Sequence, residues 1–514
     1  MKKILFTIAI VLGLINYSYA QVKFQKTYGG SGDDVATACA KTNDGGYVIG
    51  GYTTSFGNGD KDSYVIKLDE LGNIQWSKIF GGPGDDEISS ILQTFNGNYL
   101  IRGFSDNAMN SFITKMSISG EILFTKTHVN SDVGIFTPKA IQTSDNNYIT
   151  LSTTGDMSNL HMELIKFDTL GNILWQNSFG WAFGGGIAEL SNGDLIIVGA
   201  KYGSNMHDFL LIKTTSFGTL IWSKTIGTVG NDGGYNIIAM ESGNFFISGS
   251  SLNNPIGIRD FIFFETDENG NVIWANRYGE YGKDYHSNSA ISVSDNGFIT
   301  EINEGQANNG SNMGLLKTDS LGNVLWSKKY GGLLEDNCNS VVETNDGGFL
   351  LAGYTNSFGS GSKDIYIVKT DNLGNSGCYE IIGGIQSSNW NYITSSISIE
   401  TFTPVTRSNS TFPESPVTTL DSALCTTVGI NEIKSDNEFK IFPNPGNSNF
   451  QISLGVKLDY ATIEIYNTTG GKVFQERIYN TMQKEINLNN ITTGIYFVKV
   501  ISDKKYMCSK LIVE

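Results

Sequence analysis

The feature that most constrains this chain is an internal repeat with a period of about 50 residues. Its clearest copies are segments 72–82, GNIQWSKIFGG, and 322–332, GNVLWSKKYGG. Weaker copies centre on Phe124, Trp175, Trp222 and Trp274, and from Trp76 to Trp326 the successive aromatic residues are 48, 51, 47, 52 and 52 residues apart. This length suits four short strands with their turns, whereas helical solenoid repeats would show another pattern.

One period can be divided into strands from its alternation of apolar and polar residues. The predicted strands are Asp34–Thr42, Tyr47–Thr53, Ser63–Leu68 and Ile74–Phe80. The turns between them contain Asn, Asp and Gly, which tolerate positive φ. The last turn, 69–73, recurs at 168–172, 267–271, 319–323 and 371–375. The copy at 267–271 slightly resembles a calcium loop, but its siblings lack the extra carboxylates, so we interpret all of them as turns.

The chain ends predict how the repeats close into a ring. The last period reaches Asn375 and then lacks its fourth strand, whereas the segment Phe24–Gly30 matches the end of a fourth strand with no strands before it. Pairing these ends gives seven four-stranded blades, with the N-terminal strand Lys23–Tyr28 completing the last blade beside Tyr366–Thr370. We therefore predict an all-β fold containing a seven-bladed β-propeller. Six or eight blades would require a miscount of the degenerate period.

The repeated aromatic residue has two interpretations. A Trp at one fixed strand position can pack against the neighbouring blade and bury a large apolar surface. A platform for sugars would instead need the same ring exposed in every blade. Repetition in every period favours packing.

Length and the N-terminus indicate an exported protein of several units. The 514 residues exceed one ordinary domain. Residues 1–20 have two lysines, an apolar run from Ile4 to Ile15 and the ending Ser18-Tyr19-Ala20, which is typical of a cleaved signal peptide. The run is too short to span a bilayer, and no later segment could, so we expect no transmembrane segment in the mature chain.

Charge and cysteine content exclude some classes of function. The net charge is −16, and removing Lys2 and Lys3 with the signal peptide leaves −18, which disfavours nucleic acid as a partner. Five cysteines allow at most two internal disulfides, too few for a framework. They form no zinc or redox motif.

The composition changes after residue 380. We interpret 21–380 as the propeller and 381–436, rich in Ser and Thr with three prolines, as an extended linker. Cys378 and Cys425 bracket this segment and could form a clasp. Residues 437–514 contain strands with a period of two, which predict a small C-terminal β-sandwich.

Three ordered motifs and the terminus in this last segment resemble the type A sorting domain of the type IX secretion system. They are 439–445 (FKIFPNP), 463–470 (IEIYNTTG), 494–500 (GIYFVKV) and the ending 510–514 (KLIVE). The sorting residues implied by the resemblance are Pro443, Asn444, Pro445, Gly494, Tyr496 and Lys510. It implies passage through the periplasm and across the outer membrane by the type IX machinery, commonly with removal of the domain, and a final location at the cell surface or outside.

Catalytic chemistry has no support in the sequence. The four histidines, His128, His161, His207 and His286, lie in different periods, and no metalloprotease, serine hydrolase or phosphate-loop motif occurs. We expect no catalytic residue, no metal ligand and no cofactor, with a structural divalent cation left open. Because propeller enzymes scatter their residues over several blades, an enzyme also stays open.

The candidate ligand-binding residues lie in the loops that join the fourth strand of one blade to the first strand of the next. Six residues after five of the fourth strands stand Asp34, Asp86, Asp232, Asp284 and Asp336. Each could accept hydrogen bonds from its own loop, or several could converge on a cation or a hydroxyl-rich ligand. Trp181 and Phe183 replace the acidic loop in one period and are candidate contacts for a sugar or a partner, or they plug the channel.

Three functions remain. The first is a non-catalytic interaction module at the cell surface that binds a glycan or a surface protein. The alternatives are a structural or matrix protein and a polysaccharide-active enzyme.

Overall fold

The structure is a computed structural model in which part of the chain can be described. The described residues are 21–105, 110–129, 136–155, 160–180, 182–202, 206–252, 259–279, 284–286, 289–305, 311–399, 401–402, 408–409, 414–415, 420–429, 440–446, 449–467, 472–488, 491–502 and 505–513. The expected signal peptide, 1–20, lies outside them. The chain divides into two compact units, one ending at Gly429 and the other following it.

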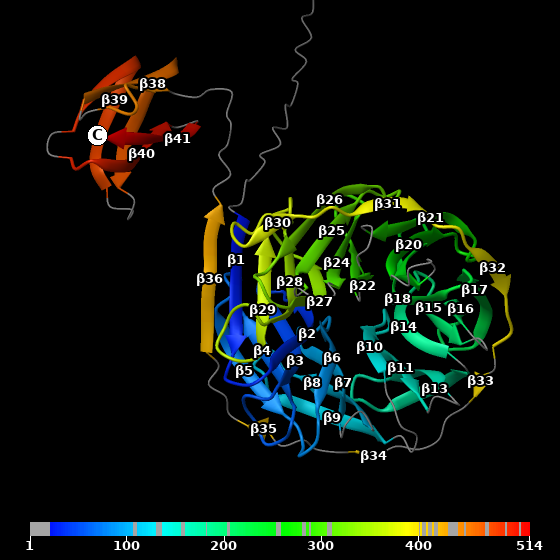
Figure 1. Ribbon diagram of the computed structural model, residues 1–514. Coiled ribbons are helices and arrows are strands. Elements are labelled where there is room, and N and C mark those ends of the chain that lie inside the picture. Colours follow the sequence, from blue (N-terminus) through cyan, green and yellow to red (C-terminus); the bar gives the residue numbers. More distant parts are fainter. Residues whose placement is uncertain are drawn as a thin grey trace, which may run out of the picture. The chain divides into compact units, whose positions relative to one another are not determined.

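Seven antiparallel sheets arranged in a ring form the first unit (Figure 1). Blade 1 is β2 (Asp34–Lys41), β3 (Tyr47–Thr53), β4 (Asp62–Leu68) and β5 (Ile74–Phe80). Blade 2 is β6 (Glu87–Gln93), β7 (Tyr99–Ser105), β8 (Asn110–Met116) and β9 (Ile122–Val129). Blade 3 is β10 (Phe136–Gln142), β11 (Tyr148–Thr154), β12 (His161–Phe167) and β13 (Ile173–Gly180). Blade 4 is β14 (Ala182–Glu189), β15 (Leu195–Tyr202), β16 (His207–Thr214) and β17 (Leu220–Gly227).

The remaining blades follow the same order with two variations. Blade 5 is β18 (Asn231–Ala239), β19 (Phe245–Leu252), β20 (Asp260–Thr266) and β21 (Val272–Gly279). Blade 6 has an inner strand in two pieces, β22 (Asp284–His286) and β23 (Ala290–Ser292), followed by β24 (Phe298–Gly305), β25 (Met313–Thr318) and β26 (Val324–Tyr330). Blade 7 is β27 (Asp336–Glu343), β28 (Phe349–Thr355), β29 (Asp364–Thr370) and β1 (Gln21–Gly29).

The N-terminal strand closes the ring, as the sequence predicts. β1 pairs antiparallel with β29, with Phe24 opposite Lys369 and Tyr28 opposite Ile365. The seven-bladed propeller with four-stranded blades and an N-terminal closing strand is therefore confirmed.

The repeated aromatic residue packs against the next blade. In all seven blades its ring lies against the glycine of the neighbouring blade's last turn, where a Cβ would approach it to within 3.1 Å or less; the pairs are Phe24–Gly72, Trp76–Gly120, Phe124–Gly171, Trp175–Gly218, Trp222–Gly270, Trp274–Gly322 and Trp326–Gly374. These glycines also have φ between 73° and 84°, a region that favours glycine. Glycine is therefore required at each of these positions, both by the turn and by the aromatic ring that lies against it. The structure supports the interpretation that the repeated aromatic residue packs between blades.

The turn at Asp267 has the same geometry as its siblings. Asp267 Oδ1 accepts hydrogen bonds from the backbone N–H groups of Asn269 and Asn271 at 2.9 and 2.8 Å. Asp319 makes the equivalent bonds at 2.9 and 2.8 Å. The slight resemblance to a calcium loop thus corresponds to an ordinary turn.

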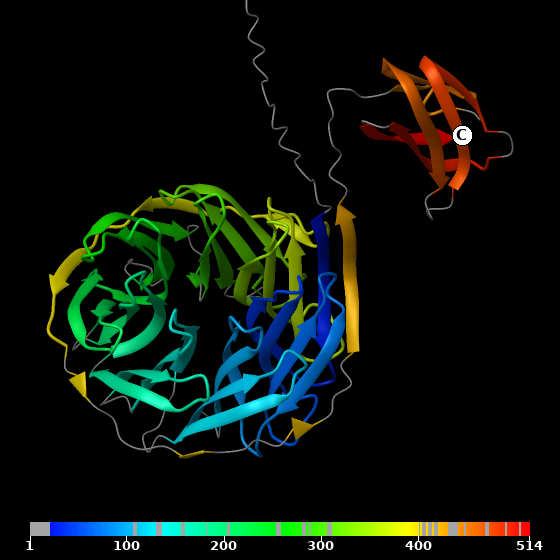
Figure 2. The same cartoon turned by 180° about the vertical axis from the view of Figure 1, so that it is seen from behind.

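The expected linker is a structural part of the propeller, and this corrects the sequence interpretation. Seven strands, β30 to β36, add one more strand to the outer edge of every blade, and all of them except β36 are short (Figures 1 and 2). They are β30 (Glu380–Ile382) on blade 6, β31 (Gln386–Asn389) on blade 5, β32 (Ile393–Ser396) on blade 4, β33 (Thr401–Phe402) on blade 3, β34 (Ser408–Asn409) on blade 2, β35 (Glu414–Ser415) on blade 1 and β36 (Leu420–Gly429) on blade 7. We call residues 380–429 the belt.

The belt also fills the outer gaps between blades. Ile385 is buried among residues of blades 5 and 6, Trp390 among residues of blades 4 and 5, and Ile399 among residues of blades 3 and 4. The side chains of β31 and β32 themselves are exposed. This explains the Ser and Thr content, because a solvent-facing edge strand needs polar residues that tolerate extended backbone.

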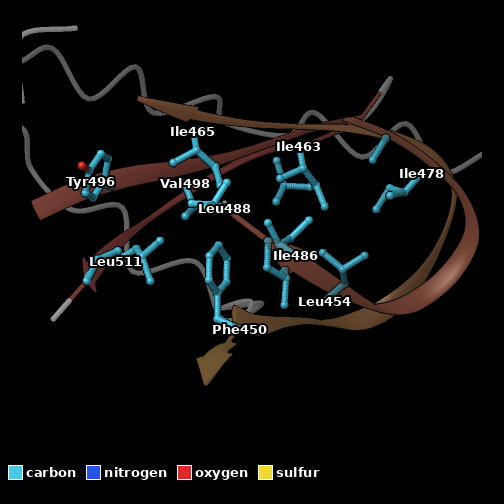
Figure 3. Packing of buried hydrophobic residues seen from close by; sticks show 14 residues of the cluster. Phe450, Leu454, Ile463, Ile465, Ile478, Ile486, Leu488, Tyr496, Val498 and Leu511 are labelled. Carbon is cyan, nitrogen blue, oxygen red and sulfur yellow. The ribbon is translucent and has the colours of Figure 1, made fainter. Parts of the chain in front are cut away.

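The second unit is a small sheet folded over its own core. It contains β37 (Lys440–Phe442), β38 (Asn449–Asn467), β39 (Lys472–Asn487), β40 (Gly494–Ser502) and β41 (Lys505–Val513). β38 changes register against β39 between Ser453 and Leu458, and β39 pairs with both halves of β38. On its other edge, β37 pairs with the first half and β40 with the second. Phe450 and Leu454 from one half and Ile463 and Ile465 from the other share one buried core (Figure 3). The expected β-sandwich therefore arises from one continuous sheet.

Candidate functional site on the loop face

The loops entering the inner strands and those joining the second and third strands lie at the same end of the propeller. Backbone hydrogen bonds join them, from Thr54 N to Asp33 O at 2.7 Å and from Asp86 N to Lys61 O at 2.8 Å. We call this end the loop face. It is where the sequence places the candidate ligand-binding residues.

Two of the candidate aspartates make the same set of contacts. Asp34 is fully buried, and its Oδ2 accepts hydrogen bonds from Gly30 N at 2.7 Å and Ser55 Oγ at 2.6 Å. Asp336 is also fully buried and accepts from Gly332 N and Ser357 Oγ, both at 2.8 Å. Each carboxylate therefore holds its own loop and a neighbouring one.

The other aspartates are placed similarly where they are described. Asp86 Oδ2 accepts from Gly82 N at 2.6 Å, and Asp232 Oδ2 accepts from Thr228 Oγ1 at 2.8 Å. Both side chains are buried. The side chain of Asp284 lies outside the described residues. These positions favour a role in holding the loops over direct contact with a ligand, because a ligand cannot reach a buried carboxylate.

A second carboxylate approaches each of two junctions between blades. A Cβ on Gly29 would lie 2.6 Å from Asp34 Oδ2 and 2.3 Å from Asp364 Oδ1. Burial raises the pKa of Asp34, the hydrogen bonds to it lower that pKa, and the nearby Asp364 carboxylate raises it further. Asp62 and Asp86 flank Gly81 in the same way. Only glycine leaves room for both side chains.

The aromatic candidates belong to blade 4. Trp181 lies outside the described residues. Phe183 is half-buried on β14, and its ring centroid lies 4.7 Å from that of Tyr202 on β15. The Tyr202 ring lies 3.9 Å from the imidazole of His207 on β16, whose pKa is lowered by burial. Three strands thus contribute a continuous row of rings at the loop face, which we call the aromatic row.

The sequence analysis did not predict that Tyr202 and His207 lie beside Phe183. Tyr202 ends one strand and His207 begins the next, and no repeat position marks either residue. The signal that could have found them is position, since the end of a second strand and the start of a third strand meet at the loop face in every blade.

A pair of lysine–tyrosine contacts was also missed. Lys61 Nζ lies 4.5 Å from the ring centroid of Tyr52 in blade 1, and Lys363 Nζ lies 4.4 Å from that of Tyr354 in blade 7. Comparing the nearly identical segments 52–62 and 354–364 could have revealed them. Lys61 also pairs with Glu87, so this contact links blades 1 and 2.

The sorting motif of the second unit organises the end of the chain. The side-chain amide of Asn444 donates to Lys510 O at 2.7 Å, and its Oδ1 accepts from Ile512 N at 2.8 Å. Pro443 and Pro445 flank it, both after cis peptide bonds.

The other sorting residues lie on the last two strands. Tyr496 is buried, and its hydroxyl donates to Thr492 O at 2.7 Å. Gly494 begins β40 opposite Val513, and the exposed Lys510 pairs with Phe497. The motif residues therefore connect the turn after β37 with the terminal strand.

The described residues contain no group of three or more acidic, histidine or cysteine side chains able to hold a metal ion. Within the same part of the chain, no helix has the length and apolar character needed to cross a membrane.

The family model for a secretion system C-terminal sorting domain matches residues 440–514. The resemblance of this segment to the type IX sorting domain is thereby confirmed. This domain marks proteins that are exported through the type IX secretion system to the cell surface or outside. No curated protein matches the chain.

Three solved structures that resemble the chain do so at low identity. Sqt1 from Chaetomium thermophilum is 11% identical over 68% of this chain and 100% of its own, with a TM-score of 0.40. Drosophila Plexin A, solved in complex with Semaphorin 1b, is 8% identical over 66% and 88%, with a TM-score of 0.34. An exo-beta-1,3-galactanase from Phanerochaete chrysosporium with galactose is 12% identical over 72% and 96%, with a TM-score of 0.31. Similarities at this level carry no argument about function.

Proposed function

We propose that the exported propeller is a non-catalytic interaction module that binds a glycan at the aromatic row of blade 4. The observation that carries this proposal is the continuous contact of Phe183, Tyr202 and His207 across three strands at the loop face. Trp181, the other aromatic candidate from the sequence, directly precedes β14 in the chain.

The chemistry of the row suits a sugar. Aromatic rings offer an apolar face, and Tyr and His add polar tips that can hydrogen-bond a hydroxyl group. The half-buried packing of Phe183 and Tyr202 supports this proposal, because rings already held in place lose little side-chain entropy on binding. Among the buried aspartates, Asp232 would act indirectly, because it accepts hydrogen bonds from Thr228 in the loop that follows β17 of blade 4.

The first experiment is a glycan array probed with the mature chain, followed by titration of the best ligand. Tyr202→Ala and Trp181→Ala should each weaken binding about fivefold or more, equivalent to about 1 kcal/mol. Tyr52→Ala is the matched control, since it removes a half-buried loop-face tyrosine from blade 1.

The proposal fails if Tyr202→Ala and Tyr52→Ala have equal effects on affinity. It also fails if the array is blank and the mature chain instead self-assembles, which would favour a structural or matrix protein. Release of shorter sugars from a polysaccharide would favour an enzyme.

A further inference from the structure

The belt begins next to a disulfide-bonded cysteine. Cys378 is disulfide-bonded and lies two residues before β30, the first belt strand. Cys39 and Cys338 are free and buried in the inner strands of blades 1 and 7. The partner of Cys378 is therefore Cys425 or Cys508, whose side chains both lie outside the described residues.

The backbone distinguishes between these two partners. Cys425 lies on β36, the last belt strand, directly opposite Gln25 on β1. The Gln25 side chain donates to Ser376 Oγ at 2.8 Å and to the carbonyl oxygen of Cys378. Gln25 thus contacts the segment just before the belt with its side chain and pairs with the last belt strand through its backbone. Cys508 lies on β41 of the other unit, opposite Lys499.

We propose that a disulfide between Cys378 and Cys425 closes the belt into a covalent hoop around all seven blades. Its formation removes two protons and two electrons from the two thiols, and a protein disulfide of an exported thiol oxidoreductase accepts them by exchange. The belt strands between the two cysteines pass blades 6, 5, 4, 3, 2 and 1 in turn before β36 reaches blade 7.

The hoop would hold the belt when the C-terminal end of the chain is pulled or removed. Peeling β36 from β1 starts at the pair Gln21–Gly429 and reaches Cys425 after four residues. Tension would then pass through the disulfide to Cys378 and bypass the strands between. This matters because β33, β34 and β35 have two residues each and few hydrogen bonds of their own.

The pairing is tested by peptide mapping of the oxidised full-length chain, with residues 437–514 retained, after the chain is unfolded and its free thiols are alkylated under non-reducing conditions. We expect one cross-linked peptide pair containing Cys378 and Cys425, with Cys39, Cys338 and Cys508 alkylated. A link from Cys378 to Cys508, or alkylated Cys378, overturns the proposal.

The role of the hoop is tested by hydrogen–deuterium exchange of the belt amides. Cys425→Ser should increase exchange in β30–β35 by roughly tenfold or more, because belt strands can then open from a free end. Cys508→Ser is the matched control and should leave the belt unchanged. If Cys425→Ser fails to fold, adding a reductant to the folded wild-type protein replaces it. If hydrogen exchange of the belt amides is unchanged after the disulfide is lost, the proposed role of the hoop is wrong.

Discussion

Replacing Trp390 by alanine should reveal how far the propeller depends on its belt. Trp390 lies between β31 and β32, and its side chain is 5% exposed. Its ring centroid lies 5.5 Å from that of Phe209 on β16 and 5.9 Å from that of Phe264 on β20. The tryptophan therefore fills the outer gap between blades 4 and 5.

The expected loss follows from this burial. A tryptophan side chain buries about 200 Å². At about 25 cal/mol per Å², removing nearly all of that contact costs about 5 kcal/mol as an upper value. Measured truncations of buried Phe or Trp cost about 3–5 kcal/mol, and the belt can relax because it lies at the surface, so we expect about 3 kcal/mol.

The assay is denaturant unfolding of the mature chain, followed by intrinsic fluorescence and by hydrogen exchange of the belt. Ile393→Ala is the control, because Ile393 is on the same belt but 68% exposed, and it should change the free energy of unfolding by less than about 0.5 kcal/mol. Equal, small effects of both substitutions would refute the view that the belt fills the gaps between blades.

Three further outcomes are expected. Deleting residues 21–30 should lower Tm by more than about 10 °C, because β1 pairs with both β29 and β36; an unchanged melting curve would refute the closure. Deleting residues 437–514 should leave the protein in the periplasm, and normal surface display of this truncation would contradict the sorting role. Burial raises the pKa of the Asp336 carboxyl group, so the native state binds a proton on this group more tightly than the unfolded chain does. The free energy of unfolding should therefore fall as pH rises from about 4, because the carboxyl group ionises. Asp336→Asn should flatten this decline, measured by unfolding at several pH values, whereas Asp60→Asn in an exposed loop should not.

Much of the propeller could be predicted because each period carries its own local signals. The glycine at 72 and its six equivalents occupy turns with positive φ and receive the aromatic ring of the preceding blade. Turn chemistry and packing thus act at the same residues, which is why a repeat search found the blades. The closing strand followed from counting, since one period lacked its fourth strand and Phe24–Gly30 supplied it.

The candidate site could be predicted only in part. The aspartates stand at or beside the start of the inner strands, at the loop face, but the sequence could not decide which way the carboxylates point. Asp34 and Asp336 turn inward because Gly30, Gly332 and the two serines offer donors there. The contact between Phe183 and Tyr202 depends on the pairing of β14 with β15.

The sequence by itself predicted the blades, their number, the closing strand and the sorting domain. Each of these has a local pattern of glycine, aromatic and alternating apolar residues that can be recognised without the structure. Only the tertiary structure decided the role of residues 380–429. Their strands are two to four residues long except β36, and β31 and β32 expose all their side chains, so no alternation marks these two strands. They gain order from the outer edges of the blades and from the gaps that receive Ile385, Trp390 and Ile399, and these edges and gaps exist only once the seven blades stand side by side.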